Sequence, residues 1–255
     1  MSGRALSFGS VAEAYELYRP DYPVEVVDTV LDYAGRRVAS ALEIGAGTGK
    51  ATRAFAARDI AVTATEPDAA MLAVLGRHVP DSVRTVRATF EDLPMIARYD
   101  LVYAAAALHW TRPEGRWERV ASLLVPGGVF ASFGGPVRLA DPALEEALRS
   151  AREPYLADDE VPPPDGTPAD SPLQWPGSEL EASEWFGDVR QVLVERRSTV
   201  PAVDFVGLLS TVSAYLELDP DVRDTVLRRI HGVLPDRVAV AADVTLHLAR
   251  RVSDA

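Results

Sequence analysis

The chain has 255 residues, of which 47% are hydrophobic and 25% charged, a profile typical of an ordinary globular protein. Its formal net charge of −12 disfavours nucleic acids and anionic membrane surfaces as partners, because both carry negative charge themselves. The absence of cysteine excludes disulfides, thiolate nucleophiles and thiolate metal sites. No apolar run approaches the roughly 20 residues of a membrane helix, so we expect a cytoplasmic protein without a membrane partner.

The first 135 residues predict two helices followed by alternating strands and helices. A helix is expected from residue 11, Pro20 and Pro23 interrupt it, and a second helix is expected from 23 to about 33. Short apolar strands are predicted over 40–44, 60–65, 83–88, 99–104 and 129–133, with helices over 51–58, 69–75 and 116–124 between them. This alternation is typical of a parallel sheet with right-handed crossovers.

The alternation ends after the fifth strand. The later chain predicts helices over 142–155, 179–186, 205–216 and 222–233, and strands over 189–200 and near the end of 238–250. Trp175 and Trp185 flank a proline-rich segment, where they either line a substrate pocket or anchor the segment to the core. This segment predicts an irregular loop or lid, and its six prolines are Pro162, Pro163, Pro164, Pro168, Pro172 and Pro176.

A glycine loop follows the first strand, with the sequence Glu43-Ile-Gly45-Ala-Gly47-Thr-Gly49. Glycines permit positive φ angles and a close approach of the backbone to a ligand, and open α/β sheets bind ligands at the carboxyl ends of their strands. The spacing is one residue too short for the dinucleotide fingerprint Gly-x-Gly-x-x-Gly. It also fails the phosphate-loop pattern, which needs four residues between its glycines and a hydroxyl after the lysine.

The loop resembles the first motif of the class I S-adenosylmethionine-dependent methyltransferases of the small-molecule type. Three later segments resemble further motifs of that family in the same order: 88–94 (Ala-Thr-Phe-Glu-Asp-Leu-Pro), 99–110 and 124–130. The resemblance covers roughly residues 40–135 and implies a Rossmann-like, doubly wound, mostly parallel seven-stranded sheet with an antiparallel last strand and a helical lid. It implies S-adenosyl-L-methionine as cofactor, S-adenosyl-L-homocysteine as product, and no metal.

The family's motifs assign roles to residues of this chain. Glu66 closes the second strand, where the family places an acid for the ribose hydroxyls, and Met71 matches a position that packs against adenine. Thr89 stands where the family commonly has Asp, so Glu91 or Asp92 is an alternative partner for the adenine amino group. The expected cofactor-binding residues are Tyr15, Arg19, Glu43, Gly45, Ala46, Gly47, Gly49, Glu66, Pro67, Met71, Thr89, Phe90, Glu91, Ala104 and Ala105.

The segment Tyr15-x-x-Tyr18-Arg19-Pro20-x-Tyr22-Pro23 resembles that of methyltransferases related to trans-aconitate methyltransferase, which esterify small acids. The resemblance favours O-methylation of a small metabolite that carries a carboxylate or a hydroxyl, with Arg19 able to bind a carboxylate in a bidentate way. His109 is the catalytic candidate, as a general base for a hydroxyl, although it and Trp110 could simply pack the site. The expected substrate residues are Tyr18, Arg19, His109, Trp110, Trp175 and Tyr215.

Other features leave alternatives open. Thr211, Ser213 and Tyr215 either contact substrate or form an exposed polar helix face, and His78, His231 and His247 are interpreted as structural. A nicotinamide-dependent oxidoreductase and a non-catalytic S-adenosylmethionine-binding module are the rival functions. We expect one domain over 1–255, as a monomer or homodimer. It would comprise a helical N-terminal cover (1–36), a cofactor-binding core (37–135), and helical lid or substrate segments (136–188 and 201–236).

Overall fold

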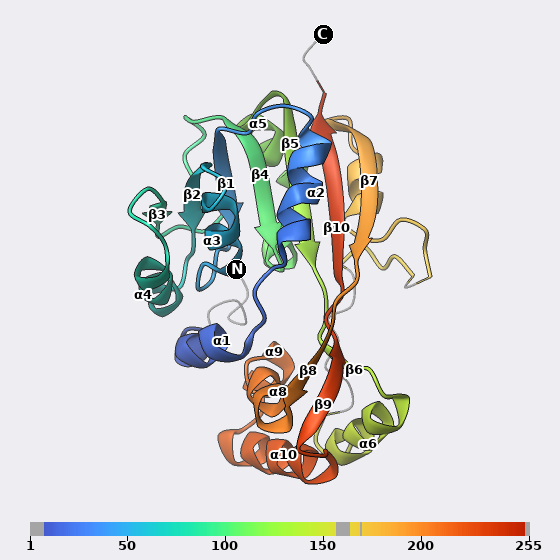
Figure 1. Cartoon of the computed structure of the whole chain (residues 1–255). Coiled ribbons are helices and arrows are strands. Elements are labelled where there is room, and N and C mark those ends of the chain that lie inside the picture. The colour runs from blue at the N-terminus through green and yellow to red at the C-terminus, as the bar shows by residue number, and fades with distance from the viewer. Residues whose placement is uncertain (1–7, 157–163, 169, 253–255) are drawn as a thin grey trace.

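The main element of the fold is a seven-stranded sheet with the order β3-β2-β1-β4-β5-β10-β7 (Figure 1). The computed structural model describes residues 8–156, 164–168 and 170–252. Strand β10 runs antiparallel to both of its neighbours, β5 and β7, whereas the pairs from β3 to β5 are all parallel, as predicted. The strands are β1 (Ser40–Ile44), β2 (Ala61–Thr65), β3 (Arg84–Val86), β4 (Tyr99–Ala105), β5 (Leu124–Gly134), β7 (Phe186–Val194) and β10 (Val244–Arg251).

Helices cover both faces of this sheet because its strands are apolar on both sides, as expected for a mostly parallel sheet. Alternate residues along β4 show this: Tyr103 packs on one face with α2 and α3, and Val102 on the other with α5 and α7. Asp68 caps α4 through its side chain, as predicted. These helices are α2 (Val24–Ala34), α3 (Lys50–Ala56), α4 (Ala69–His78), α5 (Arg116–Leu123) and α7 (Gly177–Glu181).

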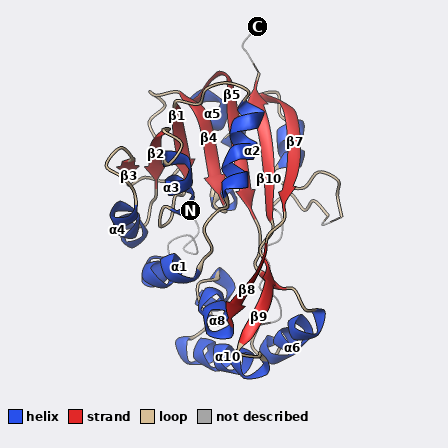
Figure 2. Ribbon diagram, in the orientation of Figure 1, coloured by secondary structure: helices blue, strands red, loops and turns tan. Residues whose placement is uncertain are grey.

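A second, three-stranded antiparallel sheet lies beyond the carboxyl ends of the parallel strands (Figure 2). It has the order β6-β9-β8 and its own apolar core, which it shares with four helices. We call this unit the small lobe. Its elements are β6 (Arg138–Leu139), α6 (Pro142–Arg152), β8 (Arg197–Pro201), α8 (Ala202–Leu209), α9 (Ser213–Leu216), α10 (Pro220–Val233) and β9 (Arg237–Ala241).

The small lobe corrects three predictions. The strand expected over 189–200 is two strands, β7 and β8, which belong to different sheets and are separated at Glu195 and Arg196. Here the backbone N–H of Arg196 donates to Oδ1 of Asp243, which holds the two crossing segments together. The expected helical lid is therefore partly a sheet. The helix expected over 205–216 is broken at Thr211, whose hydroxyl donates to the Leu208 carbonyl.

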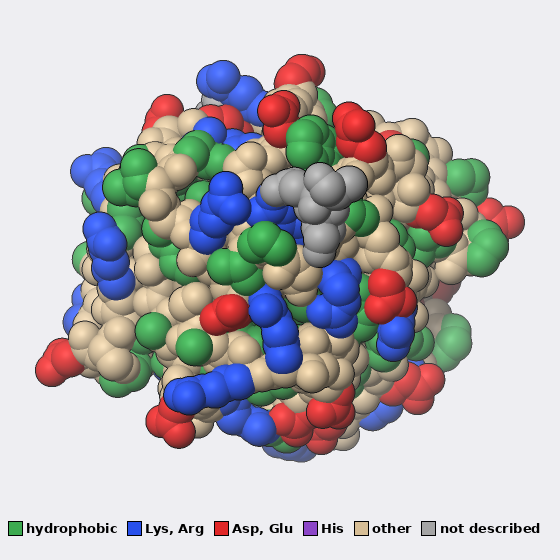
Figure 3. All heavy atoms as spheres, turned by 90° about the horizontal axis from the view of Figure 1, so that it is seen from above, with side chains coloured by type: hydrophobic (Ala, Val, Ile, Leu, Met, Phe, Trp, Pro, Cys, Tyr) green, Lys and Arg blue, Asp and Glu red, His purple; other side chains and the backbone are tan. Residues whose placement is uncertain are grey.

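Smaller differences concern the ends of elements. Strand β5 begins at Leu124 instead of 129, and α6 ends at Arg152 instead of 155. Parts of the expected cover, lid and C-terminal end lie outside the described residues, namely 1–7, 157–163, 169 and 253–255. They include Pro162 and Pro163 of the proline-rich segment. Within the described part of the chain, no helix combines the length and apolar character needed to cross a membrane. Figure 3 shows acidic and basic side chains interspersed over the face at the top of Figure 1.

The N-terminal segment packs across the carboxyl edge of the main sheet. Helix α1 (Ala12–Tyr18) contacts α4 on one side and α8 of the small lobe on the other. Lys50, the first residue of α3, is nearly buried, and its Nζ lies 3.2 Å from Oδ1 of Asp21 and 3.8 Å from Oε2 of Glu16. These ion pairs tie the N-terminal segment to the helix that follows the glycine loop.

Candidate functional site

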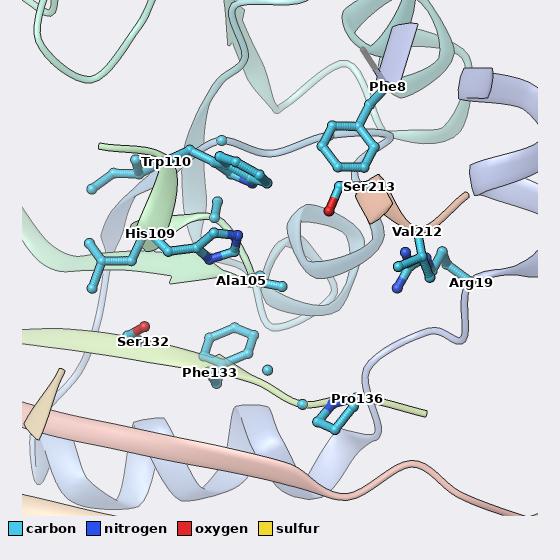
Figure 4. A pocket seen from close by; sticks show the side chains of 18 of the residues that line it. Phe8, Arg19, Ala105, His109, Trp110, Ser132, Phe133, Pro136, Val212 and Ser213 are labelled. Carbon is cyan, nitrogen blue, oxygen red and sulfur yellow. The ribbon is translucent and has the colours of Figure 1, made fainter. Parts of the chain in front are cut away.

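A cavity of about 640 Å³ lies between the carboxyl edge of the main sheet and the small lobe. The glycine loop, the ends of β4 and β5, and the N-terminal segment line one part of it, and α8 and α9 line another. Figure 4 shows the rings of Phe8, His109 and Trp110 arranged around the same open space, with Phe133 and Pro136 across from them. The cavity lies where open α/β sheets bind ligands.

The glycine loop requires its glycines for two different reasons. Gly45, Gly47 and Gly49 all have positive φ angles, at +65°, +57° and +89°. A Cβ on Gly45 would lie 2.6 Å from the Cβ of Ala107, so this glycine lets two loops at the edge of the sheet approach each other. A Cβ on Gly47 would meet no atom within 4 Å, because this residue faces the open cavity. Gly47 therefore leaves its backbone accessible to a ligand.

Glu66 lies at the end of β2 and faces the glycine loop. Its Oε2 accepts a hydrogen bond from the Gly47 backbone N–H at 2.8 Å, and its Oε1 accepts one from the Asp68 N–H at 2.9 Å. Burial raises the pKa of Glu66, and the hydrogen bonds from Asp68 and Gly47 oppose that rise. Each carboxylate oxygen has a second lone pair, so Glu66 can still accept hydrogen bonds from a diol within the cavity that it lines.

Glu43 is completely buried beneath the loop. Its Oε2 accepts hydrogen bonds from the Thr52 hydroxyl at 2.5 Å and the Tyr103 hydroxyl at 2.9 Å, whereas Oε1 has no hydrogen-bond partner. Burial raises the pKa of Glu43 to about 8, and the bonds from Thr52 and Tyr103 lower it in part. A smaller cavity of about 90 Å³, lined by Glu43 and residues 45–48, adjoins the main one. Glu43 is thus a buried acceptor with one unpartnered oxygen beside a small cavity.

The residues expected near adenine lie together at one end of the main cavity. Met71, Thr89, Phe90 and Glu91 all line it, and Pro67 lies beside them. The Thr89 hydroxyl donates to Oδ2 of Asp92 at 2.8 Å, and Oε1 of Glu91 accepts from the Arg112 backbone N–H. These contacts hold the 88–94 loop across the end of the cavity.

His109 projects into the cavity from a short 3-10 helix, η2 (Leu108–Trp110), that follows β4. Burial, assisted by the positive charge of Arg116, lowers the pKa of His109 to about 4, so its imidazole is neutral at pH 7. Its ring lies 4.4 Å from the ring of Trp110, which packs edge-on against Phe8. A neutral imidazole can accept a proton or a hydrogen bond.

The N-terminal segment supplies Tyr15 and Arg19, as expected, and also Phe8. Arg19 donates from Nε to the Thr211 hydroxyl at 2.8 Å and from Nη2 to the Thr211 carbonyl at 3.0 Å, while its guanidinium lies over the Tyr15 ring. Arg19 therefore joins the N-terminal segment to the small lobe, besides lining the cavity. Sequence patterns did not single out Phe8, which lies before the first predicted helix.

Some expected site residues lie elsewhere. Tyr18 packs against Gly207 in the small lobe, and Tyr215 is buried in the core of that lobe. Gly49 faces Leu75 and Val79, and Ala104 is buried in the sheet. Of the described residues that line the main cavity, none is Tyr18, Ala46, Gly49, Ala104 or Tyr215, although Ala46 lines the smaller one.

The cavity also includes residues that the sequence analysis did not assign to it. His247, interpreted as structural, lines it from β10, and Ser132 lines it from β5. Trp175 does line the cavity, and the buried guanidinium of Arg116 lies 5.5 Å from its ring. The strict alternation of side chains along β10 is the signal that places His247 on this face, but only once the neighbours of β10 are known. In the described residues, no three His, Asp or Glu side chains are grouped to hold a metal ion.

Comparison with known proteins identifies part of the chain. Residues 42–132, from β1 into β5, match the family model described as a methyltransferase domain. An uncharacterized methyltransferase of Mycobacterium tuberculosis is 42% identical over 125 residues, which are 49% of this chain and 50% of that protein. A Saccharomyces cerevisiae protein named as a probable S-adenosylmethionine-dependent methyltransferase is 32% identical over 124 residues, 46% of this chain and 43% of that protein. The chain spans about half the length of these curated relatives.

Solved structures extend the similarity over the whole fold. A candidate type II methyltransferase from Anaeromyxobacter dehalogenans matches with a TM-score of 0.66 and 25% identity, covering 93% of this chain and 100% of that one. Phosphoethanolamine N-methyltransferase 2 of Haemonchus contortus, in complex with phosphomonomethylethanolamine and S-adenosylhomocysteine, matches with a TM-score of 0.53 and 14% identity. It covers 96% of this chain and 58% of that one, and shares the fold. Residues 42–132 are thus similar to a methyltransferase domain, and the chain shares the Rossmann-like fold of these methyltransferases.

Proposed function

We propose that this protein is an S-adenosylmethionine-dependent methyltransferase that methylates an oxygen of a small metabolite carrying a carboxylate or a hydroxyl. The observation that carries the proposal is the arrangement of Glu43 and Glu66 around the glycine loop. Glu43 lies beneath the loop with one carboxyl oxygen unpaired, and Glu66 lies beside Gly47, whose backbone faces the cavity. The similarity of residues 42–132 to methyltransferase domains supports the same cofactor.

The residues present fit this cofactor. The amino group of its methionine half is a cation, and Glu43 offers a buried carboxyl oxygen without a partner next to the loop. Glu66 offers acceptors for the two ribose hydroxyls, and Met71 and Phe90 offer apolar walls for a base. When bound, S-adenosylmethionine supplies a methyl group on a positively charged sulfur, already activated for transfer to a nucleophile. The chain's own residues then orient the two reactants and exclude water.

The walls beyond the glycine loop favour a small acceptor. They combine apolar side chains, from Phe133, Trp175 and the lobe residues Phe205 and Leu208, with several polar ones. An ionised carboxylate needs no base, whereas a hydroxyl acceptor has neutral His109 within the same cavity to take its proton. The N-terminal segment and the small lobe close over the cavity through Arg19 and Thr211.

The first test is calorimetric titration of the purified protein with S-adenosylhomocysteine, and with NADH in a parallel experiment. We expect binding of S-adenosylhomocysteine alone, weakened at least tenfold in Glu66→Gln. Glu118→Gln removes the same charge from an exposed position on α5 and should bind like the wild type. Binding of NADH instead would point to the oxidoreductase alternative.

The second test measures methyl transfer itself. Small carboxylic acids and phenols are screened as acceptors with radiolabelled S-adenosylmethionine. Turnover of either class supports the proposal. Tight binding of S-adenosylhomocysteine, combined with no transfer to any acceptor in the panel, would favour the non-catalytic binding module.

A further inference from the structure

Three polar side chains form a row across the cavity face of the main sheet. Ser132 on β5 is the direct register partner of His247 on β10, and His247 is in turn the partner of Gln191 on β7. Directly opposed residues of antiparallel strands point to the same face with their Cβ atoms about 4.5–5.5 Å apart. The three side chains therefore stand next to one another, and Ser132 and His247 line the cavity.

The amide of Gln191 has a defined orientation. Its Oε1 accepts a hydrogen bond from the backbone N–H of Gln174 at 2.8 Å. A backbone N–H can only donate, so the side-chain atom that faces it must be the amide oxygen and not the amide nitrogen. The same oxygen lies 2.9 Å from Nε2 of His247.

This oxygen determines the tautomer of His247. An amide oxygen only accepts hydrogen bonds, so Nε2 of His247 must carry the hydrogen. Burial lowers the pKa of His247 to about 4, and the ring is neutral at pH 7. A neutral ring with its hydrogen on Nε2 has a bare lone pair on Nδ1. Among the described residues, Nδ1 has no hydrogen-bond partner, and it is not one of the side-chain atoms sealed from solvent.

The surroundings leave this lone pair facing the cavity. The Cδ2 edge of the His247 ring packs against Gly177, where a Cβ would lie 2.9 Å away, and the adjacent Nε2 faces Gln191. Because His247 lines the cavity, the edge of the ring that contacts neither of these residues, Nδ1 and Cε1, is the part left to border it. The Ser132 hydroxyl is its neighbour in the row, and Figure 4 shows this hydroxyl directed into the pocket.

The row is separate from the expected cofactor residues. Three strand spacings of roughly 4.8 Å separate β10 from β1, which places His247 about 14 Å from the strand that leads into the glycine loop. Glu43 and Glu66 lie at β1 and β2, on the other side of β4 and β5. A ligand that contacts His247 is thus either a second molecule beside the cofactor or a part of the cofactor that lies far from the glycine loop.

We propose that Nδ1 of His247, held in this tautomer by Gln191, accepts a hydrogen bond from the methyl acceptor, with the Ser132 hydroxyl beside it. The acceptor then presents a neutral O–H or N–H donor to this subsite, as in a phenol, an alcohol or an amide. An ionised carboxylate carries only hydrogen-bond acceptors, which would face the lone pair of Nδ1. The subsite therefore disfavours a carboxylate. The inference rests on the proposed methyltransferase function and narrows its substrate class toward hydroxyl compounds.

The tautomer is tested by long-range ¹H–¹⁵N NMR of ¹⁵N-histidine-labelled protein saturated with S-adenosylhomocysteine. The chain has four histidines, so His247→Asn identifies the signal. We expect a neutral ring with hydrogen on Nε2 at pH 7, and a shift of the Nδ1 signal toward the hydrogen-bonded range as phenol is added. A ring with hydrogen on Nδ1, or an Nδ1 signal unmoved up to the solubility of phenol, would overturn the inference.

A matched pair of variants tests the role in turnover. In His247→Gln, the side-chain amide can still bond Gln191, but no acceptor atom remains at the position of Nδ1. In His247→Asn, the side-chain oxygen occupies that position and can accept a hydrogen bond in its place. With the best hydroxyl acceptor, we expect KM to rise about tenfold in His247→Gln, to stay within threefold in His247→Asn, and kcat to change little in both.

The affinity for S-adenosylhomocysteine separates this inference from the proposed function. It should be unchanged in both variants, because His247 lies far from the glycine loop. Equal KM changes in the two variants, or turnover of carboxylates alone, would contradict the His247 subsite and leave the methyltransferase function standing. Failure of the wild-type protein to bind S-adenosylhomocysteine would contradict the proposed function itself.

Discussion

Arg19 and Thr211 lie 192 positions apart in the sequence, yet two hydrogen bonds join them, from Nε to the Thr211 hydroxyl and from Nη2 to its carbonyl. Arg19 belongs to the N-terminal segment, and Thr211 to the break between α8 and α9 in the small lobe. The pair spans the rim of the cavity, because both the N-terminal segment and the small lobe contribute to its lining. It is a specific link between the two elements that cover the candidate site.

Breaking this link should weaken ligand binding. We expect Arg19→Ala to raise the dissociation constant of S-adenosylhomocysteine at least tenfold, because the N-terminal segment loses its hold on the lobe. Thr211→Val keeps the carbonyl contact and should raise the dissociation constant about fivefold, in line with one hydrogen bond worth about 1 kcal/mol. If Thr211 acts through Arg19, the double variant is no weaker than Arg19→Ala alone. Additive losses in calorimetry would show that the two residues act independently.

Glu43→Gln should change how the stability of the protein depends on pH. The pKa of Glu43 in the folded protein, about 8, lies above its ordinary value of 4.5. Its contribution to stability is therefore complete below pH 4.5 and is lost as the pH rises through 8. The glutamine is neutral at every pH, so the Tm of the variant relative to the wild type should increase by several degrees between pH 5 and pH 9.

The same variant should bind S-adenosylhomocysteine about tenfold more weakly, because the cationic amino group of the ligand can ionise the carboxyl of Glu43 and pair with it, whereas an amide stays neutral. Glu118→Gln is the control for both measurements. A Tm difference that is the same at pH 5 and pH 9 would show that Glu43 ionises as readily in the folded protein as in the unfolded chain.

Gly45→Ala should be strongly destabilising. The residue has a φ of +65°, and the new Cβ would lie 2.6 Å from Ala107. The left-handed backbone and the steric overlap together should cost about 2–4 kcal/mol in urea denaturation, with loss of S-adenosylhomocysteine binding. Gly76→Ala is the matched control, because Gly76 lies on an exposed position of α4 with nothing near its Cβ. It should stabilise the protein by about 0.5–1 kcal/mol.

Acid should destabilise the protein partly through His247. Its pKa of about 4 in the folded protein lies below the ordinary value of 6.5. As the pH falls, the unfolded chain takes up the proton first, so stability is full above pH 6.5 and is lost between 6.5 and 4. At pH 5 the loss amounts to about 2 kcal/mol, at 1.36 kcal/mol per pH unit.

We therefore expect the loss of unfolding free energy between pH 7 and pH 5 to be smaller in His247→Asn than in the wild type. His231→Asn changes an exposed histidine of α10, and this variant should lose as much unfolding free energy as the wild type. Equal losses in all three proteins would show that His247 is protonated as readily in the folded state as in the unfolded chain.

Local sequence patterns were sufficient to predict the part of the fold that surrounds the glycine loop. Strand β1 was predicted with its observed bounds, and β2 and β4 to within one residue, because each is a short apolar run bounded by turn residues. Glu43, Gly45, Gly47 and Glu66 were singled out by their resemblance to family motifs along a single βαβ unit. Such a unit brings residues together through contacts between neighbouring elements, which a local pattern can describe.

The side of the cavity formed by β10 and the small lobe was decided by tertiary structure. No local pattern indicates that β9 pairs with β6 and β8, since these strands lie far apart in the chain. His247 has an ordinary strand context, and only its register with Ser132 and Gln191 places it in the cavity and determines its tautomer. Arg19 was expected to meet a ligand carboxylate, yet the fold also gives it Thr211 as a partner. The sequence by itself thus indicated the residues around the glycine loop, which are neighbours along one βαβ unit, whereas long-range strand pairing decided which side chains line the other side of the cavity.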